Sequence, residues 1–351
     1  MSNFLSDFRL GTLLTQGFIA LLISINISVT GQNQFDLVSG VLESKRQILG
    51  GNVCLLIFKD NHMIFGKKLG SYKPDTPEMI ASCSKWLTAA LVATFIDERK
   101  ISPDDTIGKF LPVFSKAGKG KITIGQCLSH TTGIESEPIT FRMLLARRKF
   151  SSLAEEVNSF AEKKMSGKPG EVFCYGNIGL NIAGRILELI SHKDFETLFQ
   201  DRIAIPLGMK KTTFKKGNSI NPSGGAVSTA SDYMNFLQMI LRKGNFRGHQ
   251  IINPKTIDMM QLSRTKNVKV VYSPAEASGF EYGWGEWILE KDKAGKTNVV
   301  SSPGLFGTYP WIDIKRNYAA IVFVKNIRFK DRQKNYLEIR EAVNEAVMAK
   351  Y

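Results

Sequence analysis

The sequence has few of the residues that build metal centres or disulfide frameworks. Its 351 residues include only four cysteines and four histidines. The cysteines show neither paired metal-ligand spacing nor the density of a disulfide scaffold. Most lie in or beside apolar segments, so we expect reduced, buried side chains, with a disulfide as the alternative. They are Cys54, Cys83, Cys127 and Cys174. The sequence therefore predicts no metal and no other cofactor.

Acidic residues are also scarce relative to basic ones, and the formal net charge is +15. Such a surface attracts anionic neighbours. The basic residues occur in small clusters, "GKKLGSYK", "EKKMSGK" and "MKKTTFKK", and are not interleaved with aromatic residues as in a nucleic-acid groove. We therefore predict no nucleic-acid partner. A solvated basic surface is the simplest interpretation, and association with anionic envelope polymers is the alternative.

A long membrane-spanning run is missing as well. "GFIALLISINISV" is apolar for thirteen residues but is interrupted by Ser24 and Asn26, which makes it a poor candidate for a span. Its place near the N-terminus, with small residues before Gln32, predicts a signal peptide over residues 1–31. An uncleaved N-terminal anchor is the alternative. We accordingly predict an exported protein, periplasmic or secreted, with one domain over 32–351.

The periodicity of the chain changes twice along its length. Phe35 to Leu49 has helical apolar spacing, and "NVCLLIF" followed by "MIFGKKLG" predicts a strand hairpin. The region of about 80–265 consists mostly of helical patterns. From about 280 the segments become short and rich in aromatic and β-branched residues, as in strands. A last helix carries an apolar stripe of Leu337, Ile339, Val343 and Val347.

This order predicts an α/β (α+β) fold in which both chain ends build one sheet. The sheet would be formed by residues of about 35–75 and 280–351, with an all-helical region inserted between them. A helix would stand at each end of the domain.

The stretch "IASCSKWLTAALVATFIDE" carries the first candidate chemistry. Ser82 would begin the apolar helix, with its hydroxyl near unpaired backbone N–H groups, and Lys85 would lie one turn later on the same face. A neutral lysine there could take the serine proton during acyl transfer, provided that its pKa is lowered. The alternative is a helix N-cap with an exposed lysine. Ser263 and Lys266 have the same spacing, but no apolar helix follows them.

A second polar pair precedes another amphipathic segment. In "KPGEVFCYGNIGLNIAGRIL", Tyr175 and Asn177 lie two residues apart in a short loop, so both side chains could project from one edge. Tyr233 and Asn235 repeat this spacing inside a helical pattern, and we expect a core residue and a surface residue there.

These stretches together resemble a known family. The chain resembles the serine hydrolases that include class C β-lactamases, D-Ala-D-Ala carboxypeptidases and related esterases. The segments that carry this resemblance are "SCSK", "ITIGQCLSHTTGI", "CYGN", "IAIPLGMKKTTF" and "GGAVSTASDYMNFLQMIL". The resemblance covers residues of about 35 to 351. It implies a β-lactamase/transpeptidase-like fold with an antiparallel sheet.

The resemblance also implies roles for particular residues. The acylated serine would be Ser82, and the base would be Lys85. Tyr175 would share the proton relay, and Asn177 would contact the substrate. The backbone N–H groups of Ser82 and Leu305 would hold the oxyanion. His130, in the family-like segment "SHTTG", would be structural.

One family motif differs in this chain. The family usually has Lys-Thr-Gly or His-x-Gly on a strand that lines the site, whereas "SSPGLFGTYPWID" has Ser302-Pro303-Gly304. Gly304 is kept and Ser302 replaces the cation, so the predicted substrate-binding set is Asn177, Ser302, Gly304 and Leu305. A cation there binds a substrate carboxylate by charge-assisted hydrogen bonds. Its loss should weaken binding of penicillins or peptidoglycan stems more than attack on an uncharged ester.

The sequence thus predicts an exported serine hydrolase that forms an acyl-enzyme on Ser82 and acts on a small-molecule ester or amide. D-Ala-D-Ala carboxypeptidase or β-lactamase activity on a peptidoglycan-like substrate is one alternative. A catalytically silent member that binds an anionic envelope polymer is another. We expect a monomer.

Overall fold

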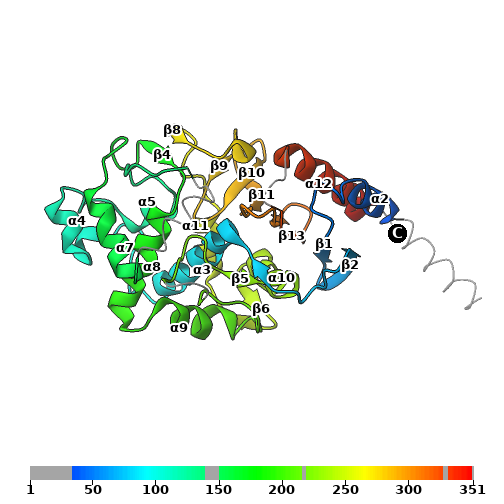
Figure 1. The fold of residues 1–351 in the computed structure, drawn as a ribbon, viewed down its shortest axis with the longest axis horizontal. Helices are drawn as coiled ribbons and strands as arrows, with labels where there is room; N and C mark the ends of the chain where they lie inside the picture. The colour runs from blue at the N-terminus through cyan, green and yellow to red at the C-terminus, as the bar shows by residue number, and fades with distance from the viewer. Residues whose placement is uncertain (1–33, 139–149, 216–218, 327–330, 350–351) are drawn as a thin grey trace, which may run out of the picture. The chain divides into compact units, whose positions relative to one another are not determined.

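The computed structural model describes residues 34–138, 150–215, 219–326 and 331–349 (Figure 1). The predicted signal peptide lies outside these residues. The described chain forms two compact units, one from Arg46 to Gln333 and a smaller one that combines residues up to Lys45 with those from Lys334 onward. Within the described residues, no helix combines the length and the apolarity that a membrane crossing requires.

The smaller unit contains the terminal helices. Helix α2 runs from Asp36 to Ser44 and is therefore shorter than the predicted helix over 35–49. It buries Val38 and Leu42. Residues 45–50 form turns instead. Helix α12, Arg332–Met348, buries Ile339, Val343 and Val347 of the predicted stripe, whereas Leu337 is only half-buried.

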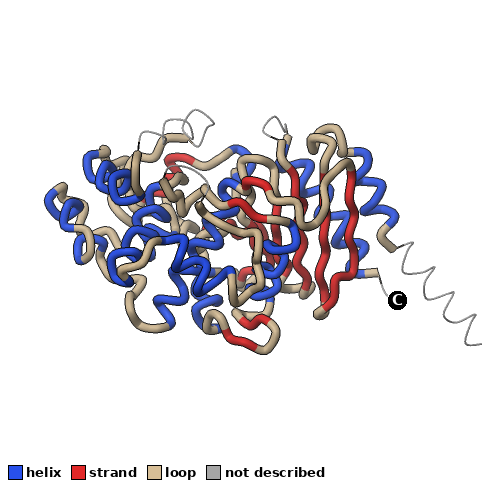
Figure 2. Tube along the Cα trace, turned by 60° about the horizontal axis from the view of Figure 1, so that its bottom comes forward, coloured by secondary structure: helices blue, strands red, loops and turns tan. Residues whose placement is uncertain are grey.

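The larger unit is built on a seven-stranded antiparallel sheet of order β2-β1-β13-β12-β11-β10-β9. Figure 2 shows its strands side by side in red. The strands are β1 Val53–Lys59, β2 His62–Leu69, β9 Glu281–Tyr282, β10 Trp287–Lys291, β11 Thr297–Ser301, β12 Tyr309–Asp313 and β13 Tyr318–Val324. The β1–β2 hairpin turns at Asp60 and Asn61, both with positive φ. The prediction that one sheet combines strands from both ends of the chain is confirmed.

The inserted region is mainly helical, as predicted. Its helices are α3 Ser84–Asp97, α4 Pro112–Lys116, α5 Ile124–Leu128, α7 Leu153–Ser159, α8 Ile178–Ser191, α9 Phe195–Phe199, α10 Ala230–Leu241 and α11 Pro254–Met260. Short helical turns add η1 Ala81–Cys83, η2 Ile107–Lys109, η4 Phe160–Glu162 and η5 Gln200–Ala204, and η6 Ala275–Ala277 follows the region. Helix α10 packs on β1, β12 and β13, and α8 packs on α3, α5 and α7.

The expectation of an all-helical insertion needs one correction. Short strands also occur there: β3 Glu78–Met79 pairs with β5 Val227–Ser228, β4 Val172–Cys174 pairs in parallel with β8 Lys269–Tyr272, and β6 Asn245–Phe246 pairs with β7 His249–Gln250. Segments of two to four residues show no alternation that a pattern can reveal, because their pairing is fixed by distant chain segments.

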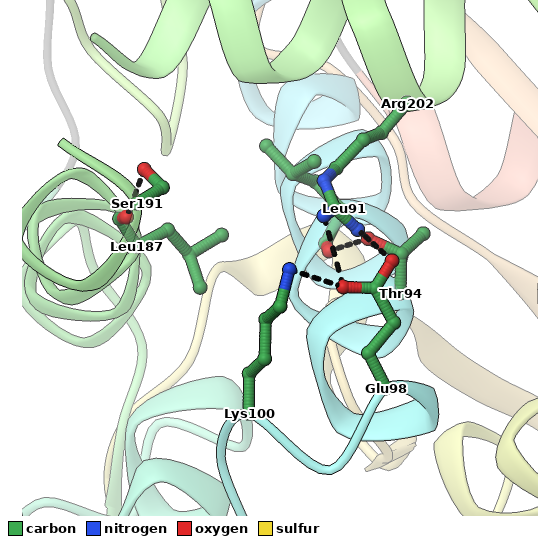
Figure 3. A network of polar contacts seen from close by, with 7 residues as sticks. All are labelled: Leu91, Thr94, Glu98, Lys100, Leu187, Ser191 and Arg202. Atoms are coloured by element: carbon green, nitrogen blue, oxygen red, sulfur yellow. Dashed lines mark hydrogen bonds and ion pairs between the residues drawn. The ribbon is translucent and has the colours of Figure 1, made fainter. Parts of the chain in front are cut away.

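Helix α3 is the central helix of this unit. All residues from Ser84 to Phe95 are buried, including the polar side chains Ser84, Lys85, Thr88 and Thr94, as expected for a helix that is surrounded by protein. At its C-terminal end Arg202 donates to both carboxylate oxygens of Glu98, at 2.8 and 3.0 Å (Figure 3). The guanidinium also lies 4.1 Å from the ring centre of Phe95. A bidentate, stacked arginine has a defined geometry, so this end of α3 is held in place.

Candidate active site

Ser82 lies in the 3₁₀ turn η1, two residues before α3 begins. The residue before it, Ala81, has φ +44°, a region that residues other than glycine rarely adopt. Two hydrogen bonds hold this strained turn: Ser84 Oγ donates to the Ala81 carbonyl at 2.6 Å, and Tyr233 Oη donates to the Cys83 carbonyl at 2.9 Å. Backbone strain of this kind persists where surrounding contacts enforce it. The contacts therefore fix the direction of the Ser82 side chain.

Lys85 is fully buried and turns its amine toward Ser82. Its Nζ lies 3.3 Å from Ser82 Oγ, 3.2 Å from Asn177 Oδ1 and 2.8 Å from the carbonyl oxygen of Ser223. Ser82 does not act as a helix N-cap, because neither η1 nor α3 has a side-chain cap. The alternative of a cap beside an exposed lysine is therefore wrong.

The environment of Lys85 favours its neutral form. Burial lowers the pKa of Lys85 to about 7, against a smaller opposing effect of Cys83. A neutral amine has two N–H donors and one lone pair. The two carbonyl oxygens, of Asn177 and Ser223, can accept the two N–H groups. The lone pair is then available to the Ser82 hydroxyl, which is the arrangement that a general base needs.

Tyr175 follows β4 and is nearly fully buried. Burial raises the pKa of Tyr175, and a hydrogen-bonding contact with Ser82 opposes that rise. Its backbone N–H donates to the Tyr272 carbonyl on β8 at 3.0 Å, and its ring centre lies 5.1 Å from that of Trp287. The aromatic cluster and the β4–β8 pairing thus hold the Tyr175 hydroxyl beside Ser82.

His130 belongs to the same aromatic cluster. Its ring centre lies 4.6 Å from that of Tyr175 and 4.9 Å from that of Tyr282. Burial lowers the pKa of His130 well below its usual value, so the ring is neutral. These contacts are those of a packed side chain, as the resemblance implied.

The third-motif segment also contacts the turn that carries Ser82. Ser302 Oγ donates to the carbonyls of Ser82, at 3.3 Å, and of Gly285, at 3.1 Å, and the side chain is 1% exposed. A Cβ on Gly304 would lie 2.4 Å from the Ile80 carbonyl oxygen, which requires glycine at this close approach. The predicted substrate contact of Ser302 stays a prediction, and its hydroxyl is engaged by backbone.

The two backbone N–H groups expected to form an oxyanion hole have no other acceptor. Within the described residues, neither the N–H of Ser82 nor that of Leu305 donates a hydrogen bond. Leu305 directly follows Gly304, which contacts the turn that carries Ser82. Both donors therefore remain available to a ligand.

Ser223, whose carbonyl accepts from Lys85 Nζ, could not be predicted from the sequence. This residue contributes a backbone carbonyl, which every amino acid has, so no side-chain pattern could identify it. Tyr233 is expected from the sequence to be a core residue only; it is fully buried, but its hydroxyl also donates to the Cys83 carbonyl in the turn that carries Ser82. All four cysteines are free and buried, as predicted.

Residues 37–344 match the sequence model of the family described as Beta-lactamase. The chain belongs to the β-lactamase family. It is thus a serine hydrolase of the β-lactamase-related, penicillin-binding-protein-like group.

Three relatives illustrate the similarity. The D-alanyl-D-alanine-carboxypeptidase/endopeptidase AmpH of Escherichia coli (strain K12) is 22% identical, over 80% of this chain and 81% of its own. A Bacteroides dorei DSM 17855 protein, whose crystal structure carries a provisional β-lactamase description, is 30% identical with a TM-score of 0.79, covering 88% of this chain and 99% of its own. EstCE1, a hydrolase with promiscuous acyltransferase activity, shares the fold at 19% identity, with a TM-score of 0.74, over 90% of this chain and 99% of its own.

Proposed function

We propose that the protein is an exported hydrolase that forms an acyl-enzyme on Ser82 and cleaves esters or amides that lack a required carboxylate. The observation that carries this proposal is the position of Lys85: its buried amine lies 3.3 Å from Ser82 Oγ and has two carbonyl acceptors for its N–H groups. A lysine with a pKa of about 7 can accept a proton near neutral pH.

The proposed reaction has two halves. As Ser82 Oγ bonds to the acyl carbon, its proton passes to Lys85 Nζ, and the carbonyl oxygen becomes an oxyanion held by the N–H groups of Ser82 and Leu305. The oxyanion collapses, and the leaving alcohol or amine takes the proton, relayed through Tyr175. Water then attacks the acyl-enzyme, gives a proton to the same base, and releases the acid with Ser82 restored.

The choice of substrate class follows from position 302. Ser302 carries no charge, and its hydroxyl donates to two backbone carbonyls. Among the contacts described for Ser82, Lys85 is the only basic side chain, and the proposed reaction uses it in its neutral form. A substrate carboxylate would therefore lack the charge-assisted hydrogen bond that a lysine or histidine supplies in related sites.

A D-Ala-D-Ala carboxypeptidase is the second candidate, and the similarity to AmpH along most of both chains favours it. The two candidates differ in their demand for a carboxylate. We suggest comparing an activated short-chain ester with the same ester bearing a terminal carboxylate. The ester-directed proposal expects the neutral ester to have the higher kcat/KM, with turnover lost in Ser82→Ala. A strong preference for the carboxylate would favour the carboxypeptidase.

Two further parts of the proposal need separate tests. Export predicts that the mature protein begins near Gln32, which N-terminal sequencing of the protein from its natural host would show. If wild type turns over neither ester and yet binds anionic glycopolymers, the catalytically silent alternative gains support instead.

A further inference from the structure

The loop of residues 221–226, "NPSGGA", lies against the polar side of α3. Three α3 residues bind it: Ser84 Oγ accepts from the Ala226 N–H at 3.0 Å, Lys85 Nζ donates to the Ser223 carbonyl at 2.8 Å, and Thr88 Oγ1 donates to the Pro222 carbonyl at 2.6 Å. All three side chains are buried. The first three polar side chains of α3 therefore all bond to one backbone segment.

Ser223 links this loop to the start of α8. Its Oγ donates to the Asn177 carbonyl at 2.7 Å, and its backbone N–H donates to Asn181 Oδ1 at 3.0 Å. Asn177 also supplies Oδ1, the second acceptor for Lys85. The two groups that receive the Lys85 N–H groups are thus tied to each other.

Asn181 extends the network to α7. It is fully buried, and its Nδ2 donates to Glu156 Oε2 at 3.1 Å. A buried amide that bonds on both sides has one orientation only, because the reversed orientation would place donor against donor and acceptor against acceptor. Glu156 thereby fixes which end of Asn181 faces the Ser223 N–H.

We propose that Asn181 and Ser223 are positioning residues, which hold the two carbonyl oxygens against the amine of Lys85 and so direct its lone pair at Ser82. This inference rests on the proposed role of Lys85 as base. Small displacements of a base cost large factors in rate, so the effect is measurable although neither side chain contacts the substrate.

The pH dependence of such a site reports on Lys85. The titratable groups that face it are Cys83 on η1, His130 after α5 and Tyr175 after β4. Burial keeps His130 neutral and raises the pKa of Cys83 and of Tyr175. None of the three changes charge near neutral pH, so the acid limb of the rate profile belongs to Lys85.

The test compares Asn181→Leu with the double variant Asn181→Asp/Glu156→Gln. The first variant removes both side-chain hydrogen bonds of Asn181. The double variant keeps both, since the new amide at position 156 can donate to the new carboxylate at position 181, which can also accept from the Ser223 N–H. It also keeps one carboxyl group and one amide group in the pair. Asn235→Leu is the matched control, because Asn235, on α10, donates its amide to the Leu207 carbonyl, away from Lys85.

Two readouts separate positioning from general destabilisation. We expect Asn181→Leu to lower kcat/KM on an activated ester by about tenfold and to move the acid limb to lower pH, because the charged amine loses an acceptor. Asn181→Asp/Glu156→Gln should recover the rate to within about threefold of wild type. The pKa of Lys85, measured by ¹³C NMR of its ε-carbon, should follow the same order without any need for turnover.

Melting temperatures show which variants fold. If Asn181→Leu does not fold, Ser223→Ala serves as the test variant, because it removes only the hydrogen bond to the Asn177 carbonyl. We then expect a smaller fall in kcat/KM and a smaller fall in the pKa of Lys85. The proposal is overturned if the folded variants keep the wild-type pKa of Lys85, or if Asn181→Asp/Glu156→Gln stays as slow as Asn181→Leu. An inactive wild type whose Lys85 pKa still shifts would refute the hydrolase function and leave the positioning network standing.

Discussion

The hydroxyl of Ser302 donates to the carbonyl oxygen of Ser82 at 3.3 Å. Together with its bond to the Gly285 carbonyl, this contact joins the end of β11 to the turn that carries the nucleophile. The position at which related proteins carry a cation for the substrate is used here to hold the enzyme's own backbone. The proposed function therefore predicts weak recognition of a substrate carboxylate, while the two hydrogen bonds tether the Ser82 turn.

Replacing Ser302 with alanine should therefore affect both stability and rate. The substitution removes one O–H donor that two buried carbonyl groups share, so we expect the free energy of unfolding to fall by about 1–2 kcal/mol. We also expect kcat/KM on an activated ester to fall by roughly tenfold, because the Ser82 turn is less well held. Urea unfolding and steady-state kinetics measure the two effects.

Ser301→Ala is the matched control for this change. Ser301 is the neighbouring residue on β11, is also fully buried, and donates to the Pro310 carbonyl at 2.6 Å. It should lose a similar amount of stability while keeping its rate. Equal rate losses in both variants would show that Ser302 has no special relation to the nucleophile.

The rate should depend on pH through Lys85. Because burial lowers the pKa of Lys85 to about 7, the amine is protonated and inactive as a base below that pH and neutral above it. We expect kcat/KM to rise about tenfold for each pH unit below 7 and to level off above it. Lys85→Arg, which stays protonated, should be inactive across the range. A profile that is flat from pH 5 to 9 would contradict this account.

Glu286 should destabilise the fold as the pH rises. Its side chain is fully buried, and within the described residues neither carboxylate oxygen has a hydrogen bond of normal geometry; a weaker contact with the Trp86 indole only partly opposes the effect of burial. Burial raises the pKa of Glu286 well above its usual value, so the folded protein keeps a proton that the unfolded chain has lost. Stability is therefore lost progressively as the pH rises from about 4.5 toward the folded-state pKa, by about 1.4 kcal/mol per unit.

Glu286→Gln removes this titration, so its melting temperature should exceed that of wild type at pH 9, with the difference closing by pH 4. Glu162→Gln, at an exposed position on η4, should follow wild type throughout. If Glu286→Gln melted below wild type at pH 9, the carboxyl would be ionised and paired, contrary to the structure.

Gly304 should not tolerate a side chain. A Cβ would lie 2.4 Å from the Ile80 carbonyl oxygen and 3.2 Å from Cys83 Sγ, on both sides of the Ser82 turn. We expect Gly304→Ala to cost about 1–3 kcal/mol and at least tenfold in kcat/KM. Gly66→Ala, whose Cβ would make an ordinary 3.5 Å contact with Leu56 Cδ2, should leave both unchanged. Wild-type kinetics in Gly304→Ala would place the third motif further from the nucleophile than the structure does.

Several features of the fold could be predicted because local pattern and burial agree. The strands from Tyr282 onward are short and rich in aromatic and β-branched residues, and α3 lies in a long apolar run. Strands β4 and β8 escaped prediction because their pairing depends on chain segments about a hundred residues apart.

The candidate site likewise contains residues that the sequence predicts and groups that it does not. Side chains at fixed spacing, such as Ser82 with Lys85 and Tyr175 with Asn177, leave a signal in the sequence. The carbonyl of Ser223 leaves none. The direction of the Ser302 hydroxyl depends on the position of the Gly285 backbone. Gly285 has φ +75° and packs directly on the Lys85 carbonyl. Tertiary contacts therefore set the direction of the Ser302 hydroxyl, and the local sequence does not reveal it.

The most direct test of the account is time-resolved intact mass of the chain from Gln32 onward, mixed with an activated short-chain ester, with Ser82→Ala run in parallel. We predict a transient increase in mass by one acyl group in wild type and none in Ser82→Ala. If wild type consumed no ester and carried no adduct, or if Ser82→Ala carried the same adduct, Ser82 would not be the acylated nucleophile.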